Sequence, residues 1–325
     1  MKKAFFSILL ALVATVGAKA QQISVVSGGN TSIYSTLQAA IEAAPNNSVI
    51  YLPGGGFPID DSVKVTKPLT IIGIGHKVKG ENADGYTTIS GNLWFNEGSS
   101  GSAVMGVYMT GNVKIGSDGA QVNNVLVRYC NINAIEVYNK TCLGTVINQN
   151  YIRSDSNFSQ ACGEFSNNIA FSVFDLDNGF VEYNIFFGGH NGGYYHGYDA
   201  HSVCSTESTS VKGNIFLSKS FCGGNCQLYE NMTYWDWKED EKNIYIENVD
   251  WSQVFVKHSG ITPASDYHFK GDYLKYNGKC GIYAGDTSFS DTALPPVPYI
   301  VAKQIPEQTD ANGKLNIKIR VRAGE

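Results

Sequence analysis

The side chains that could do chemistry are densest in one glycine-rich stretch, residues 188–201. It contains three of the six histidines of the chain, with an aspartate and three tyrosines. A histidine such as His196 or His201, oriented by Asp199, can act as a general acid or base, and the same groups can bind a cation. The alternative is a surface loop in which glycines form turns and the rings pack. Three residues of this stretch are candidates for substrate binding: Tyr194, Tyr195 and Tyr198.

Two carboxylates precede this stretch. Asp175 and Asp177 are separated by one residue, so a strand would place both on the same side. A carboxylate pair can hydrolyse a glycosidic bond or bind Ca²⁺, which makes Ca²⁺ the candidate cofactor. Because Asn178 and Gly179 follow directly, the alternative is that both aspartates belong to a turn.

Aromatic and cationic side chains offer a second route to ligand binding. Trp235 and Trp237 come just before an acidic run, residues 239–241. Exposed rings stack on the apolar faces of sugars, whereas buried rings pack the core, and the sequence leaves both interpretations open. Arg153 is one of two arginines between residue 20 and Arg320. Its charge could neutralise a substrate carboxylate, or it could be an ordinary surface charge.

The elements that must position these side chains are mostly short strands. The chain contains 35 glycines, and only 16% of its residues are charged, a composition typical of turn-rich β-proteins. One helix is predicted over residues 34–44, where apolar side chains recur at helical spacing and a proline follows. Strand-length apolar runs come next, beginning with residues 48–52, 63–65 and 69–72.

Asparagine recurs within similar apolar segments along the middle of the chain. The last asparagines of five such segments are spaced by 19, 34, 30 and 34 residues. Stacked turns of a β-solenoid share one core and repeat the same residue at equivalent turns, and asparagine tolerates the left-handed backbone of such turns. The alternative is a sandwich of antiparallel hairpins with unrelated asparagine turns. The five residues are Asn131, Asn150, Asn184, Asn214 and Asn248.

Three segments near the start resemble a known superfamily. Residues 37–45, 49–55 and 67–75 are similar to the N-terminal cap and first turns of pectin-lyase-like right-handed parallel β-helix proteins, and the asparagine segments resemble their stacked turns. The resemblance covers roughly residues 30–255. It implies an all-β, single-stranded, right-handed parallel β-helix with an N-terminal capping helix.

The same resemblance implies a role with polysaccharide. Well-known members of the superfamily cleave acidic polysaccharides by β-elimination or hydrolyse glycosidic bonds in a groove along one face. The Asn-Thr-Asp, Gly-His-Gly and Arg-Ile-Lys motifs of the polygalacturonase-type hydrolases are absent. Since one fold hosts many activities, we predict a protein that acts on or binds polysaccharide, as a lyase or a hydrolase. The alternative is a non-catalytic cell-surface, adhesion or structural protein.

Residues 1–20 have the pattern of a secretory signal. Two lysines precede an apolar run that ends in the small-residue pattern of a cleavage site. The run is short for a membrane span, and none is expected once it is removed. We therefore expect a bacterial protein that is secreted, periplasmic or on the cell surface. The predicted organisation is a signal peptide (1–20), a β-helix domain (21–293) and a C-terminal linker with a capping strand (294–325).

Charge and cysteine content narrow the partners. The formal charge is −5, and the chain without residues 1–20 carries −8, which argues against nucleic acid. The resemblance to the pectin-lyase-like superfamily implies a polysaccharide or cell-surface glycan as the partner. Seven cysteines in an exported chain suggest disulfides, and Cys222 with Cys226 is the most suggestive pair. Zinc binding that includes Cys204, or plain buried thiols, are the alternatives.

The C-terminal residues 314–322 alternate between apolar and polar or cationic side chains. A proline-rich linker, residues 294–298, precedes them. The alternation predicts a half-buried edge strand that returns to cover the C-terminal end of the solenoid. A sorting tail of an exported protein is the alternative.

Overall fold

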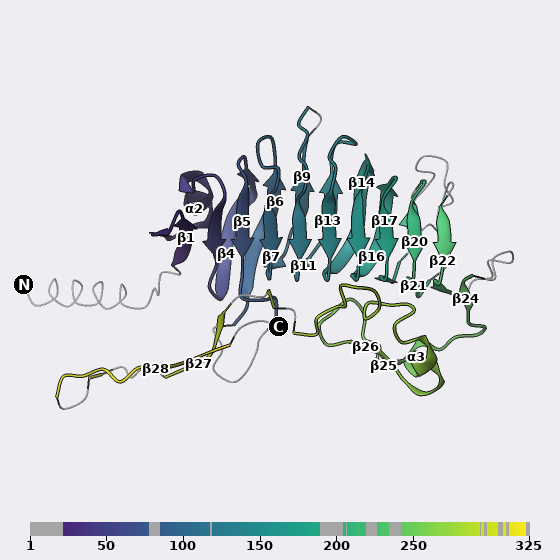
Figure 1. Cartoon of the computed structure of the whole chain (residues 1–325). Coiled ribbons are helices and arrows are strands. Elements are labelled where there is room, and N and C mark those ends of the chain that lie inside the picture. Colours follow the sequence, from purple (N-terminus) through teal and green to yellow (C-terminus); the bar gives the residue numbers. More distant parts are fainter. Residues whose placement is uncertain are drawn as a thin grey trace, which may run out of the picture.

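The computed structural model describes residues 22–77, 85–117, 119–188, 204–205, 207–218, 226–233, 242–292, 294–295, 298–304, 308–309 and 312–322. Strands dominate these residues, and most lie in two long, mainly parallel sheets (Figure 1). The protein is therefore all-β, as its composition indicates. In the described ranges, no helix is long and apolar enough to cross a membrane.

The two long sheets are called sheet A and sheet B. Sheet A contains, in spatial order, β2 (Asn30–Tyr34), β1 (Ile23–Ser27), β3 (Ser48–Tyr51), β5 (Leu69–Ile72), β7 (Ala103–Met105), β10 (Leu126–Arg128), β13 (Thr145–Asn148), β15 (Gly163–Ser166), β17 (Phe180–Glu182), β20 (Ser210–Lys212) and β22 (Gln227–Tyr229). Sheet B contains, in chain order, β4 (Gly55–Val65), β6 (Thr87–Phe95), β8 (Tyr108–Met109), β9 (Val113–Ile115), β11 (Asn131–Ile132), β12 (Ile135–Val137), β14 (Tyr151–Ala161), β16 (Ile169–Leu176), β18 (Ile185–Phe186), β19 (Cys204–Ser205), β21 (Ile215–Phe216), β23 (Met232–Thr233) and β24 (Ile244–Tyr245).

From β3 onwards the chain alternates between the two sheets. Val127 of β10, for example, pairs in parallel with Val104 of β7 before it and Ile147 of β13 after it. Each passage of the chain thus adds one layer to each sheet, and the predicted alternative of an antiparallel sandwich is wrong. Equivalent positions form columns, of which the inward column of sheet A is fully buried: Ile50, Ile71, Val104, Val127, Ile147, Phe165, Val181 and Val211.

The core lies between the inner faces of the two sheets. Both sheets contribute large rings to it: Phe165 from sheet A, and Phe186 and Phe216 from sheet B, stack on one another. The rings of Phe165 and Phe186 are 6.0 Å apart, and those of Phe186 and Phe216 are 5.4 Å apart. Such continuous apolar burial is the main favourable term that holds stacked layers together, because no layer has a core of its own.

The predicted helix is present as α2 (Leu37–Ala43), at the β1–β3 end of the sheets (Figure 1). Its first turn is fixed by Thr36, whose hydroxyl accepts the backbone N–H of Ala39 at 3.3 Å. Leu37 and Ile41, on the face that the periodicity predicts as apolar, are buried against the first strands. Pro45 follows the helix, as expected for a residue that cannot extend it.

A row of buried asparagine side chains joins successive layers where the chain passes from sheet A to sheet B. In the typical case Asn184 Oδ1 accepts the backbone N–H of Asn168 at 2.8 Å. Its Nδ2 donates to Asn214 Oδ1 at 2.9 Å and to the Phe165 carbonyl at 2.8 Å. The members of this asparagine ladder are Asn150, Asn168, Asn184, Asn214, Asn231 and, half-buried in the last layer, Asn243.

The ladder differs from the predicted row at both ends. Cys130 occupies the position before Asn150, whose Oδ1 accepts its N–H at 2.9 Å, so Asn131 is one residue out of place. Asn248 is exposed and lies outside the ladder. The spacing missed three members, because both 34-residue intervals span more than one turn of the chain. The missed members are Asn168, Asn231 and Asn243.

A left-handed residue precedes most ladder positions. Gln149, Tyr183 and Glu230 have φ of 57°, 58° and 59°, a conformation that side chains other than glycine adopt at a cost. At Gly213, with φ of 62°, that cost is absent. The left-handed residue turns the chain into sheet B, and the ladder asparagine that follows it is buried. Because water cannot reach this turn, the asparagine amide bonds the backbone groups instead.

Residues 251–289 cover part of the outer face of sheet B. They include α3 (Trp251–Val254), β25 (Phe255–Lys257), β26 (Asp266–Phe269) and the 3-10 helix η1 (Gly271–Tyr276), which lie beneath the sheets in Figure 1. Phe255 is fully buried, with its ring 5.1 Å from that of Tyr267 and 5.7 Å from that of Phe269. The residues of sheet B in this second apolar cluster are Tyr151, Ile169, Ile185, Ile215 and Met232.

The next part of the chain, residues 281–292 with 294–295, is here named the return segment because it runs back across the layers. Its backbone N–H groups donate to the Gly213 carbonyl at 2.7 Å and to Gln149 Oε1 at 3.0 Å. Further along, Pro295 lies so close to Gly106 that a Cβ on that glycine would be 2.6 Å from the proline ring. The segment therefore passes from late layers to early ones.

The C-terminal strand exists but is not where the sequence predicts it. β28 (Lys318–Arg322) pairs antiparallel with β27 (Tyr299–Gln304), and this hairpin extends away from the sheets (Figure 1). Ile319 and Val321 are 53% and 54% exposed, so the predicted half-buried face is not formed. The expectation that this strand covers the end of the sheets is wrong, since its partner in the described residues is β27.

The described cysteines behave mainly as buried thiols. Cys130, Cys142 and Cys280 are buried, and none of them forms a disulfide. Burial raises the pKa of the Cys130 and Cys280 thiols to about 12, so both stay protonated. The predicted pair of Cys222 and Cys226 is not tested, because Cys222 lies outside the described residues.

We predict that Asn184→Ala lowers the free energy of unfolding by about 2–4 kcal/mol, because the buried Asn168 N–H and Phe165 carbonyl lose a partner. Urea unfolding followed by circular dichroism measures the change. Asn277→Ala is the matched control, since this exposed asparagine follows η1 outside the ladder. A loss for Asn184→Ala no greater than for the control would contradict a stabilising role of the ladder.

We also predict that Phe255→Ala lowers the free energy of unfolding of residues 251–289 by about 3–5 kcal/mol, because it leaves a cavity at a fully buried site. Val256→Ala, at the next residue with 51% exposure, should change stability by less than about 0.5 kcal/mol. Hydrogen exchange resolved by residue measures both changes. Unchanged protection of residues 251–289 in Phe255→Ala would show that this segment does not depend on the second cluster.

Candidate functional site

The structure describes three of the predicted site residues: Arg153, Asp175 and Asp177. The remaining candidates lie outside the described residues, so their prediction stays untested. They are His196, Asp199, His201, Tyr194, Tyr195, Tyr198, Trp235 and Trp237.

The described ends of the histidine-rich insertion fix where it leaves and rejoins sheet B. Gly188 donates its N–H to the Phe171 carbonyl at 2.9 Å. After the insertion, β19 pairs with β16 through Cys204 with Val173 and Ser205 with Phe174. Both ends therefore lie beside the same strand, β16.

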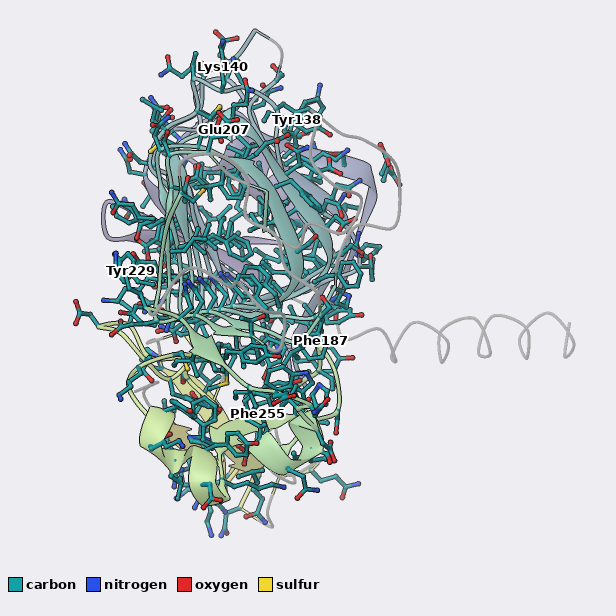
Figure 2. All side chains as sticks on the ribbon, turned by 90° about the vertical axis from the view of Figure 1, so that its right-hand side faces the viewer. Tyr138, Lys140, Phe187, Glu207, Tyr229 and Phe255 are labelled. Carbon is teal, nitrogen blue, oxygen red and sulfur yellow. The ribbon has the colours of Figure 1, made fainter. Side chains whose placement is uncertain are left out.

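The two aspartates differ in their surroundings. Asp175 is a left-handed residue within β16, with φ of 51°, and Leu176 after it is fully buried. Asp177 lies just past the strand, where its Oδ1 accepts the backbone N–H of Glu207 at 3.0 Å; Figure 2 labels Glu207 at this part of the sheets. Burial raises the pKa of the Asp177 carboxyl above its ordinary value. Asp177 thus binds the backbone of the next layer, in the way the turn interpretation expects.

Arg153 is held in sheet B by its neighbours. Its guanidinium donates to the Met109 carbonyl at 2.6 Å and to Asn131 Oδ1, and it lies 4.9 Å from the centre of the Tyr108 ring. Burial lowers its pKa, although a guanidinium stays charged at any physiological pH. These contacts fix the side chain over the start of β8 and β11, so the guanidinium already has partners within the protein.

A row of side chains that the sequence did not single out lies on the outer face of sheet B. In register, Lys64 of β4 pairs with Trp94 of β6, Trp94 with Lys114 of β9, and Lys114 with Glu136 of β12. Tyr138 follows β12 and is labelled on this flank in Figure 2. These five residues are here called the sheet B strip.

The aromatic part of the strip is ordered by polar contacts. Lys64 Nζ lies 4.9 Å from the centre of the Trp94 ring, a cation–π contact. Trp94 Nε1 donates to the Gly116 carbonyl at 2.7 Å, which fixes the orientation of the indole. The Tyr138 ring is 6.2 Å from that of Trp94. The rings of Trp94 and Tyr138 therefore lie side by side at the surface, next to the ammonium group of Lys64, and the indole is fixed by its hydrogen bond to Gly116.

Glu136 is the carboxylate of the strip, and three groups surround it. Tyr138 donates its hydroxyl to Glu136 Oε2 at 2.5 Å, and Lys114 Nζ is 3.9 Å from the same oxygen. Asn112 Nδ2 donates to Oε1 at 2.6 Å. Both carboxylate oxygens are thus engaged while the side chain is 33% exposed, so Glu136 is oriented and still accessible.

A second chain of amides on the outer face positions Glu136. Asn112 accepts from Asn133 Nδ2 at 2.8 Å and donates its backbone N–H to Asn92 Oδ1 at 2.8 Å. Ser154 Oγ donates to Asn133 Oδ1 at 3.0 Å. These hydrogen bonds connect four layers. Asn112, which donates to Glu136, is therefore held by the layers on both sides of it.

Burial raises the pKa of Tyr138 to about 12, and its hydrogen bond to Glu136 and the charge of that carboxylate act in the same direction. The phenol therefore remains a donor at all physiological pH. Together the strip presents stacking surfaces, ammonium donors and one oriented carboxylate, the groups that bind the apolar face and the hydroxyls of a sugar.

The strip left only a weak signal in the sequence. Each of its strands shows an outward polar or aromatic residue between buried apolar neighbours, as in Val63-Lys64-Val65 and Ile135-Glu136-Val137. The alternation indicates which residues face out. It does not indicate that residues some 20 to 30 positions apart along the chain share one column, because the lengths of the connecting turns vary.

The described residues contain no group of three or more histidine, cysteine, aspartate or glutamate side chains that could hold a metal ion. The candidate Ca²⁺ site therefore finds no support in this part of the chain. The insertion of residues 189–203 is outside it.

Comparison with protein-family models, with curated proteins and with solved structures finds no match to this chain. The structure itself adds the mostly parallel strands in stacked sheets, an arrangement compatible with a parallel β-helix.

We predict that Tyr138 titrates near pH 12 in the folded protein and that Glu136→Gln lowers this value, because the mutation removes a negative charge beside the phenol. Since the folded-state pKa is raised above 10, the stabilisation linked to it is present below that pH and is lost as the pH rises towards 12. NMR of ¹³C-tyrosine-labelled protein, assigned with Tyr138→Phe, measures the titration. Glu97→Gln is the control, and equal titration of Tyr138 in both glutamine variants would refute the coupling.

Proposed function

We propose that the protein is an exported bacterial parallel β-helix of the pectin-lyase-like kind that binds polysaccharide along the sheet B strip. The sequence of residues 37–75 resembles that superfamily. The alternation of the chain between two parallel sheets and the helix α2 at their first end support a right-handed solenoid with a capping helix.

The single observation that carries the binding proposal is the strip itself. A polysaccharide presents a repeated unit, and a column of side chains from successive layers offers a repeated surface at the strand spacing of about 4.8 Å. Trp94 and Tyr138 supply stacking surfaces, while Lys64, Lys114 and Glu136 supply donors and acceptors for hydroxyl and carboxylate groups. Strips of aromatic and charged groups on an exposed face are characteristic of recognition surfaces.

The proposal places the protein outside the cytoplasm, where the signal-like residues 1–20 would direct it and where extracellular or cell-surface glycan is available. Whether the polymer is also cut depends on acid–base groups beside the strip. His196, Asp199 and His201 remain the proposed candidates, because both described ends of their insertion lie beside β16 of the same sheet.

We predict that the mature chain binds at least one polysaccharide from a panel of neutral and acidic plant, algal and host polymers. Trp94→Ala should weaken that binding by roughly tenfold, since it removes the main stacking surface. Lys64→Met should weaken binding of acidic polymers more than of neutral ones, because it removes the more exposed of the two cations of the strip. Affinity electrophoresis and calorimetry measure both effects.

Lys257→Met is the matched control, because Lys257 is an exposed lysine of β25, outside the strip. Equal binding by Trp94→Ala and by the unaltered protein would refute the strip as the site. Mass spectrometry of the same incubations separates the possible activities: unsaturated termini indicate elimination, water-added products indicate hydrolysis, and intact polymer indicates binding alone.

A further inference from the structure

A hollow lies at the β22 end of sheet A, on the opposite side of the core from the sheet B strip. It has a volume of about 840 Å³ and opens to solvent beside β22, the last strand of that sheet in the described residues. Figure 2 labels Tyr229 on this flank. The described residues that line it are Lys212, Cys226, Gln227, Leu228, Tyr229, Glu230 and Lys242.

Strand register brings these residues together. Glu182 of β17 pairs with Lys212 of β20, which pairs with Tyr229 of β22, so the three form one outward column. Ser210 and Gln227 pair with each other in the neighbouring outward column. The hollow therefore rests on rigid strands, where side-chain geometry is better defined than on loops.

Lys212 is held between two aromatic rings. Its Nζ lies 5.6 Å from the centre of the Tyr183 ring and 5.5 Å from that of Tyr229, and 3.7 Å from Glu230 Oε2. The hydrogen bond to Tyr183 raises the pKa of Lys212, so the ammonium is charged. The return segment supports this arrangement, since a Cβ on Gly285 would be 2.6 Å from the Tyr183 ring.

Tyr229 is oriented by a chain of hydroxyl groups. Ser210 Oγ donates to Glu182 Oε1 at 2.8 Å and is 3.2 Å from the Tyr229 hydroxyl. With its own proton directed to Glu182, Ser210 Oγ accepts the proton of Tyr229. The ring of Tyr229 is thus held at two points, by Ser210 at its edge and by Lys212 over its face.

Side chains of both positive and negative charge line the hollow, and they determine which class of ligand it can bind. Lys212 and Lys242 are offset by Glu230 in the lining and by Glu182 beside Lys212, so neither an anion nor a cation meets a region of one sign. Hydroxyl groups can donate to the carboxylate and accept from the ammonium, so a neutral polyol satisfies both. An aromatic ring adjacent to such groups favours the apolar face of a pyranose.

We propose that this hollow is a second carbohydrate site, which takes a short neutral saccharide over Tyr229 with its hydroxyls bonded to Lys212, Glu230 and Gln227. The inference does not rest on the sheet B strip, because no residue is shared and the two sites lie on different sheets. A protein with both sites would hold two glycan segments at once, which raises its apparent affinity for a polymer surface.

Calorimetric titration of the mature full-length chain with cellohexaose, mannohexaose, maltohexaose and xylohexaose tests the proposal. We expect saturable binding of at least one of them, weakened about tenfold or more in Tyr229→Ala and weakened in Lys212→Met. Tyr229→Phe, which keeps the ring, should retain most of the affinity. Tyr51→Ala is the control, because Tyr51 is a partly exposed tyrosine in an early layer of sheet A.

Trp94→Ala separates this proposal from the proposed function. Loss of hexasaccharide binding in Tyr229→Ala but not in Trp94→Ala supports the second site, whatever the strip does. Loss in Trp94→Ala alone assigns the saccharide to the strip and overturns the second site. Absence of saturable binding by all four sugars, or tighter binding of hexagalacturonate than of any neutral sugar, also overturns it. Circular dichroism of each variant excludes unfolding as the cause of a loss.

Discussion

The structure depends on a row of buried asparagine amides. Where the chain passes from sheet A to sheet B, its backbone is removed from water. Each ladder asparagine accepts a backbone N–H of the neighbouring layer and donates to a backbone carbonyl of that same layer. A residue such as alanine would leave both groups unsatisfied in an apolar environment. The ladder therefore fixes the register between layers, and register decides which side chains become neighbours on the outer faces.

Both candidate sites follow from that register. On sheet B, one outward residue from each of four strands and a tyrosine just past the last of them make the strip, and a parallel chain of amides braces its carboxylate. On sheet A, the same rule places Glu182, Lys212 and Tyr229 in one column. Because inward positions are filled by apolar residues that stack from layer to layer, the outward positions are free to differ without loss of the core.

The C-terminal residues cover one part of the outer face of sheet B and leave another part exposed. Residues 251–289 pack on the strands that begin at Tyr151, Ile169, Ile185, Ile215 and Met232, and they turn those apolar outward positions into a second core. The strip lies on earlier layers and on later parts of the strands, outside that cover. The return segment then crosses the layers and supports Tyr183, so a distant part of the chain contributes to the geometry around Lys212.

The sequence by itself determined the local structure. Composition, alternation and the spacing before Pro45 predicted a β-rich chain with one early helix, and Asn150, Asn184 and Asn214 marked the ladder correctly. Only the tertiary structure decided the rest. Local pattern does not reveal the three ladder asparagines inside long intervals, Cys130 in place of an asparagine, or the hairpin that β28 forms with β27. Columns such as Lys64, Trp94 and Lys114 join residues from separate layers, and turn length, which sequence alternation does not encode, sets their alignment.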